Sequence, residues 1–113
     1  MVDISADLKA EGIAAYQQGT APRDLPETFV TVWEYPSENI THGDNKPTQC
    51  RREWEIVFYT TDAAQIYSGL EAVIKALKKR GYATIGQGGD ASGTWEGYNA
   101  RAVDVVKIEN LED

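Results

Sequence analysis

The stretch CRREWEIVFYTTDAAQIYSGLEAVIKALKKRG, residues 50–81, contains a two-residue hydrophobic period followed by a helical one. In its first part, one set of positions alternates with another: Arg52, Trp54, Ile56 and Phe58 with Arg51, Glu53, Glu55 and Val57. This alternation predicts a strand over 50–60 with one buried face. The second part then spaces its apolar residues for one face of a helix: Ile66, Leu70, Val73, Ile74 and Leu77. Such a stripe needs a sheet on which to pack.

Both ends of this helix carry termination signals. Asp62 is a suitable N-cap residue, and Gln65 stands three positions later, as in a capping box. The last turn is basic and is followed by Gly81, which suits the left-handed position after a helix. The sequence therefore predicts a helix over 62–80.

The N-terminal part predicts a second amphipathic helix over 3–18, with Asp3 as N-cap and Gly19 as the stop. A proline-containing connector follows it. The β-branched and aromatic segment TFVTVWEY, residues 28–35, predicts a strand that Pro36 ends.

Two further strands are predicted over 82–88 and 100–108, which completes the order helix, two strands, helix, two strands. We expect one α+β domain over residues 1–113 in helix-hairpin-helix-hairpin order. Its sheet is expected to be four-stranded and mostly antiparallel, with both helices packed on one face. A chain of this length buries roughly 65% of its unfolded surface.

Two segments between these elements are expected to be loops. Residues 36–48 are polar and longer than a hairpin connection needs, and 86–99 is rich in glycine. Long loops are often functional, so both are candidate contact surfaces.

Composition excludes several classes of function. Eighteen acidic against eleven basic residues give a net charge of −7, which disfavours binding nucleic acid or anionic lipid through a basic face. A single cysteine, Cys50, forms no internal disulfide and is expected to be a half-buried strand residue. The N-terminal segment lacks the basic and apolar pattern of a signal peptide, so we expect the protein to be made and kept inside a cell.

The sequence contains no recognisable catalytic constellation. Residues 86–91 match the dinucleotide pattern G-x-G-x-x-A, but the following sequence predicts no helix to face a pyrophosphate. His42 is the single histidine and lies in a polar loop, which suits a surface residue better than a general base. Glu53 and Glu55 share one strand face and are interpreted as solvated.

A calcium loop is also disfavoured, because Asp44 and Asn45 beside Gly43 lack further ligands at the required spacing. We therefore expect no enzyme activity, no cofactor and no metal.

Three tryptophans have different predicted roles. Trp33 and Trp54 lie in strands and are expected in the core. Trp95 stands with Tyr98 in the glycine-rich segment, where the two rings either anchor a partner or fold back over the end of the sheet.

Several stretches together resemble the small tail-component proteins of siphophages, the minor tail or tail-terminator proteins of phages of Gram-positive bacteria. The resemblance covers roughly residues 25–108 and is carried by four features. These are Leu25–Phe29, the turn from Asp44 to Pro47, Trp54 with Phe58 and Tyr59, and the helix end Lys78–Gly81. The segment 86–99 departs from the family pattern, which more often has an acidic, Ser/Thr-rich sequence there.

This resemblance implies a structural protein of the virion tail, made in the host cytoplasm. It implies a ring, typically a hexamer, that caps the tail tube and meets the head connector, so that the partners are further copies, the tube protein and connector proteins. Six copies carry about −42 charges in total, which lets DNA pass without binding. The interface candidates are His42, Asp44, Asn45, Lys46, Trp95 and Tyr98. The alternative is a small-ligand module that stacks a sugar or nucleotide on Trp95 and Tyr98, with no membrane contact in either case.

Overall fold

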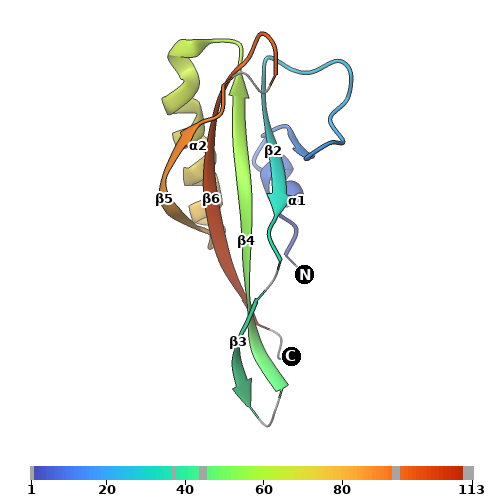
Figure 1. Ribbon diagram of the computed structural model, residues 1–113, viewed down its shortest axis with the longest axis vertical. Helices are drawn as coiled ribbons and strands as arrows, with labels where there is room; N and C mark the ends of the chain where they lie inside the picture. The colour runs from blue at the N-terminus through green and yellow to red at the C-terminus, as the bar shows by residue number, and fades with distance from the viewer. Residues whose placement is uncertain (1, 37, 44–45, 93–94, 111–113) are drawn as a thin grey trace.

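The computed structural model describes residues 2–36, 38–43, 46–92 and 95–110, with backbone only for 38–43, 46–49 and 110. Within these residues six strands form one sheet. They are β1 (Ala15–Gln17), β2 (Thr28–Glu34), β3 (Glu38–Gly43), β4 (Lys46–Thr60), β5 (Ala83–Asp90) and β6 (Asn99–Asn110). The helices are α1 (Ile4–Ala10) and α2 (Ile66–Lys79), the latter preceded by a 3-10 turn over Ala63–Gln65 (Figure 1).

The sheet has the order β1-β2-β4-β6-β5. β3 pairs with the first part of β4, which extends beyond the end of β2. β1 runs parallel to β2, whereas the other pairs are antiparallel. The α+β class holds, but the predicted four-stranded antiparallel sheet in helix-hairpin order is wrong. Two short strands, β1 and β3, were missed, and β1 makes the sheet mixed.

The missed strand β1 follows from an early end to α1. Gly12 adopts φ +79°, and Ile13 N–H donates to the carbonyl of Leu8 while Gly12 N–H donates to Lys9. This pair of bonds is the Schellman motif, which needs a left-handed residue and therefore favours glycine. The helix thus ends eight residues before the predicted end at 18. The chain is then free to pair as β1 from Ala15.

The ends of α2 follow the sequence signals more closely. Asp62 Oδ1 accepts a hydrogen bond from Ala64 N–H at 3.0 Å and caps the 3-10 turn. At the other end Gly81 has φ +94°, and Tyr82 N–H donates to the carbonyl of Leu77. The predicted helix over 62–80 is confirmed as a 3-10 turn continued by α2, although the side chain of Gln65 makes no capping hydrogen bond.

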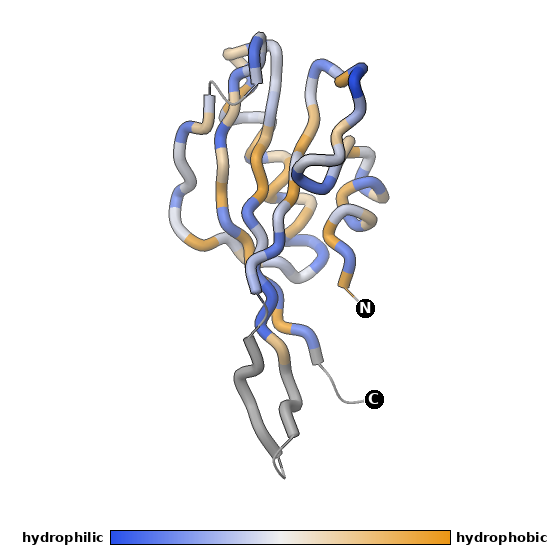
Figure 2. Tube along the Cα trace, turned by 45° about the vertical axis from the view of Figure 1, so that its right-hand side comes forward, coloured by the Kyte–Doolittle hydropathy of each residue, from blue (hydrophilic) through white to orange (hydrophobic). Residues whose placement is uncertain are grey.

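Two hydrophobic clusters lie on opposite faces of the sheet. The larger cluster joins both helices to the sheet and includes Ile4, Leu8, Val30, Val32, Trp54, Ile56, Phe58, Leu70, Val73, Leu77, Tyr82, Val103 and Val105. The smaller cluster contains Phe29, Val57, Tyr59 and Ala100, with Tyr16, Leu25, Trp95 and Tyr98 packed against it. Figure 2 shows the hydrophobic segments running along the strands and helices of this body.

Strand β4 is therefore buried on both faces over its C-terminal part. Val57, predicted on the solvent side, is only 6% exposed, and Tyr59 on the same face is 3% exposed. The connectors before β2 and before β6 cover them, which the alternation within β4 does not reveal. Trp33 shows the opposite error, because it was expected in the core and is 44% exposed. The smaller cluster ends before it reaches this residue.

Candidate assembly interface

A β-hairpin made by β3 and the paired part of β4 projects from the body; we call it the arm (Figure 1). Its pairing runs from Glu38 opposite Arg51 to Gly43 opposite Lys46, with two register shifts. The Cα radius of gyration is 15.2 Å and the longest extent 52 Å. A compact domain of this length has a radius of gyration of roughly 13 Å. The projecting arm accounts for the elongated shape.

The arm replaces most of the loop that the sequence predicts over 36–48. Between Glu38 and Gln49 the sequence has one aliphatic or aromatic residue, Ile40. A hairpin that covers no core needs no alternating apolar residues, so the usual sequence signal for strands is missing.

The structure places the interface candidates of this segment as follows. His42 lies on β3 opposite Pro47, and Lys46 begins β4, with only the backbone described for both. Asp44 and Asn45 lie outside the described residues. Cys50, expected to be half-buried, is 8% exposed at the base of the arm.

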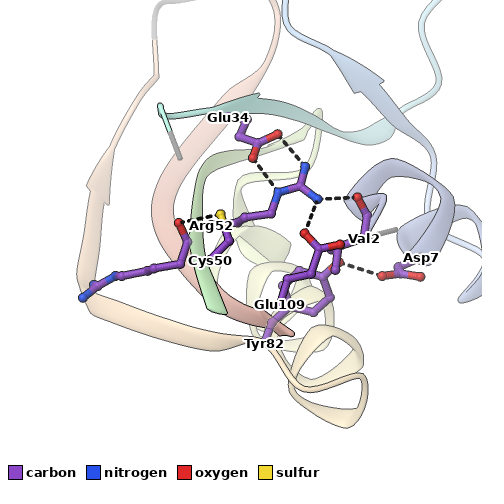
Figure 3. A network of polar contacts seen from close by, with 8 residues as sticks. Val2, Asp7, Glu34, Cys50, Arg52, Tyr82 and Glu109 are labelled. Carbon is purple, nitrogen blue, oxygen red and sulfur yellow. Dashed lines mark hydrogen bonds and ion pairs between the residues drawn. The ribbon is translucent and has the colours of Figure 1, made fainter. Parts of the chain in front are cut away.

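Arg52 holds the base of the arm to the body (Figure 3). Its Nε and one terminal nitrogen donate to the two carboxylate oxygens of Glu34 at 2.7 and 2.8 Å. The other terminal nitrogen donates to the carbonyl of Val2 at 2.8 Å and lies 3.5 Å from Glu109. The guanidinium also lies over the Trp54 ring, 5.1 Å from its centroid. The hydrogen bond to Glu34 raises the pKa of Arg52 above its usual value.

These contacts join β2, β4, β6 and the N-terminal segment at the point where the arm leaves. Arg52 was placed by the sequence on the buried face of its strand, but its partners lie 18 to 57 positions away in the chain. No local pattern identifies such partners.

A second polar network ties α1 to α2. Arg80 Nε and Lys79 Nζ donate to the carboxylate of Glu11 at 2.8 and 2.9 Å. These hydrogen bonds lower the pKa of Glu11. Tyr82 donates its hydroxyl hydrogen to Asp7 at 2.6 Å, visible in Figure 3. Burial, and then this bond to a carboxylate, raise the pKa of Tyr82.

The face of the sheet opposite the helices is open beside the arm; we call it the open face and define it by Trp33, Tyr35, Glu53, Glu55 and Asp104. Glu55 lies directly opposite Trp33 on one side and Asp104 on the other. Trp33 and Tyr35 meet edge to face at 4.8 Å, and the Tyr35 hydroxyl donates to Asp104 at 3.0 Å. Burial and this bond raise the pKa of Tyr35 to about 12. This face combines an exposed aromatic ring with carboxylates, of which Glu53 is paired with Arg51 at 3.0 Å.

Trp95 and Tyr98 fold back over the sheet, which is one of the two alternatives that the sequence left open. Both rings meet Phe29 edge to face, at 5.4 and 5.2 Å between centroids, and both also contact Tyr59. The Tyr98 hydroxyl donates to the carbonyl of Pro26 at 2.8 Å. Both rings are partly buried, so their role as interface residues stays a prediction.

The glycine-rich segment forms strand rather than a phosphate-binding turn. β5 extends through Asp90, and its pairing with β6 shifts register between Ile85 and Gly89. In the described part of the segment no helix follows the glycines. The described residues also contain no group of three or more His, Cys, Asp or Glu side chains that could hold a metal ion.

Comparison with protein-family models gave no match, and comparison with curated proteins gave none. No helix among the described residues is long and apolar enough to cross a membrane.

Proposed function

We propose that this chain is a structural component of a phage tail, a tail terminator or head-to-tail completion protein that assembles as a ring at the end of the tail tube. The resemblance in sequence named above motivates the proposal. The observation that carries it is the arm, a paired hairpin that is fastened at its base by Arg52 and projects from the body (Figure 1).

Because its backbone projects away from the helices and the central sheet, the arm has little of its own subunit to pack against (Figure 1). Such a hairpin can pack against a neighbouring molecule, as expected for a subunit that contacts copies of itself or an adjacent ring. The net charge of −7 per chain suits a channel through which DNA moves without being held. The partners in this proposal are further copies, the tail tube protein and head connector proteins.

The small-ligand alternative has no comparable support. It needs Trp95 and Tyr98 as a free stacking platform, yet both rings pack against Phe29 and Tyr59.

Native mass spectrometry over a concentration series, with electron micrographs of the same samples, tests the ring. We expect a discrete oligomer, with six copies as the leading expectation. In a shortened variant, residues 39–50 are replaced by Asn-Gly, a turn that suits a two-residue hairpin joining the paired residues Glu38 and Arg51. This variant is expected to fold and to lose the oligomer. A chain that stays monomeric at every concentration contradicts the ring.

The place of the chain in the tail is tested in particles assembled without it. Overlong or unsealed tails support a terminator, whereas sealed tails of normal length contradict that role.

A further inference from the structure

The open face presents an unusual side chain to solvent. Trp33 is 44% exposed. Tryptophan is among the residues that contribute most to binding energy when an interface buries them. It stands on β2 between the smaller cluster and the arm, and no helix covers this face. A partner that covers Trp33 would remove a large apolar surface from water.

The carboxylates around Trp33 indicate the charge of that partner. Glu55 and Asp104 lie directly opposite each other on neighbouring strands, an arrangement of like charges that is unfavourable in the free subunit. Tyr35 donates a hydrogen bond to Asp104 but brings no positive charge. A cationic group placed beside Glu55 would relieve this repulsion.

The opposite side of the molecule has a complementary feature, the α1–α2 groove. Two hollows of about 320 and 350 Å³ share Ile13 and Ala72 and so form one groove between the end of α1 and the neighbouring side of α2. Its lining includes Phe58 and Ala76, and its rim carries Lys75 and Lys79. Lys79 is paired with Glu11, while Lys75 is exposed on α2.

We propose that neighbouring copies of the chain meet head to tail, with Trp33 of one copy seated in the α1–α2 groove of the next and Glu55 facing Lys75. This inference rests on the ring proposed above and adds a second contact between neighbouring copies to the one expected from the arm. Because the open face and the groove lie on opposite sides of one sheet, each copy has one donor and one acceptor surface. A heterologous contact of this type repeats from copy to copy and closes into a ring when the rotation allows it.

Two charge reversals test the contact. Glu55→Lys places a lysine against Lys75 of the next copy, and Lys75→Glu places a glutamate against Glu55. Each variant alone is expected to raise the concentration needed for half-assembly by roughly tenfold or more, because like charges then meet across the contact. An equimolar mixture of the two variants restores opposite charges at every contact. The mixture is therefore expected to form rings in which the variants alternate, visible as equal numbers of each in the mass spectrum.

Matched controls carry the same charge changes at exposed positions away from both surfaces. Asp24→Lys and Arg23→Glu, in the connector before β2, are expected to assemble like the unchanged chain. Trp33→Ala is expected to weaken assembly in any background, including the mixture. Circular dichroism of each variant confirms that it is folded.

The outcomes separate this contact from the ring itself. If the unchanged chain forms no discrete oligomer, both proposals fail. If rings form and both charge variants assemble normally, the ring stands and this contact is wrong. If each variant is defective but the mixture does not recover, the groove and the open face meet other partners, and the head-to-tail contact is likewise refuted.

Discussion

Replacing Gly69 by alanine tests how closely α2 lies on the sheet. A Cβ atom at this position would come within 2.7 Å of Phe58 Cε2 and closer still to Cζ. The Phe58 ring is 2% exposed and part of the larger cluster, so it cannot move away freely. Overpacking of this kind costs about 1 to 3 kcal/mol.

The opposing effect is the helix propensity of alanine. Glycine inside a helix is about 1 kcal/mol less favourable than alanine, so Gly69→Ala without a clash would stabilise the protein. With the clash, we expect a net loss of about 1 to 2 kcal/mol in the free energy of unfolding. Urea unfolding followed by tryptophan fluorescence measures it, since Trp54 is 2% exposed in the folded state.

Two further variants isolate the clash. Ser68→Ala, on the exposed side of the same helix, gains propensity without meeting the sheet and is expected to stabilise by up to about 0.5 kcal/mol. In a Phe58→Leu background the ring is gone, and Gly69→Ala is then expected to become stabilising by about 1 kcal/mol. If Gly69→Ala stabilises the unchanged protein, the close approach of α2 to Phe58 is refuted.

Three other predictions concern the polar contacts. Arg52→Met removes the ion pair and both hydrogen bonds from Arg52 to Glu34. Because both side chains keep some exposure, we expect a loss of about 1 to 3 kcal/mol in the free energy of unfolding measured with urea. An unchanged midpoint would show that these contacts contribute nothing to stability. Tyr35 has its pKa raised to about 12, so its stabilising effect is present below pH of about 10 and is lost as the pH rises through about 12. Asp104→Asn is expected to lower the pKa of Tyr35, measured from the ultraviolet absorbance of tyrosinate. An unchanged pKa would contradict the hydrogen bond from Tyr35 to Asp104. Tyr98→Phe removes the bond to the connector before β2 and is expected to cost about 1 kcal/mol, with a cost near zero contradicting that contact.

Signals that are local in the chain predicted the corresponding elements well. The cap at Asp62 and the stop at Gly81 are hydrogen-bonding requirements of one helix, and the structure meets both. At α1 the same kind of signal was present at Gly12, but the apolar residues beyond it kept the helical spacing and favoured Gly19 as the stop. Periodicity alone did not distinguish a helix from a short helix followed by a strand.

Features that depend on a second layer were not predictable in this way. Trp33 and Trp54 both lie in strands, yet one is 44% and the other 2% exposed. Trp54 lies on the face of the sheet that the helices cover. Trp33 lies on the other face, and there the connectors cover only one end. The partners of Arg52 and the pairing of β3 with β4 are likewise set by segments that meet only in the folded chain.

The arm and the centre of the molecule share a single strand. β4 runs for 15 residues from the arm into the body, where side chains of successive residues enter both hydrophobic clusters. It is one continuous strand, and Arg52 fastens it where the arm begins. A force that a neighbouring molecule applies to the arm is therefore transmitted along β4 to both hydrophobic clusters at once.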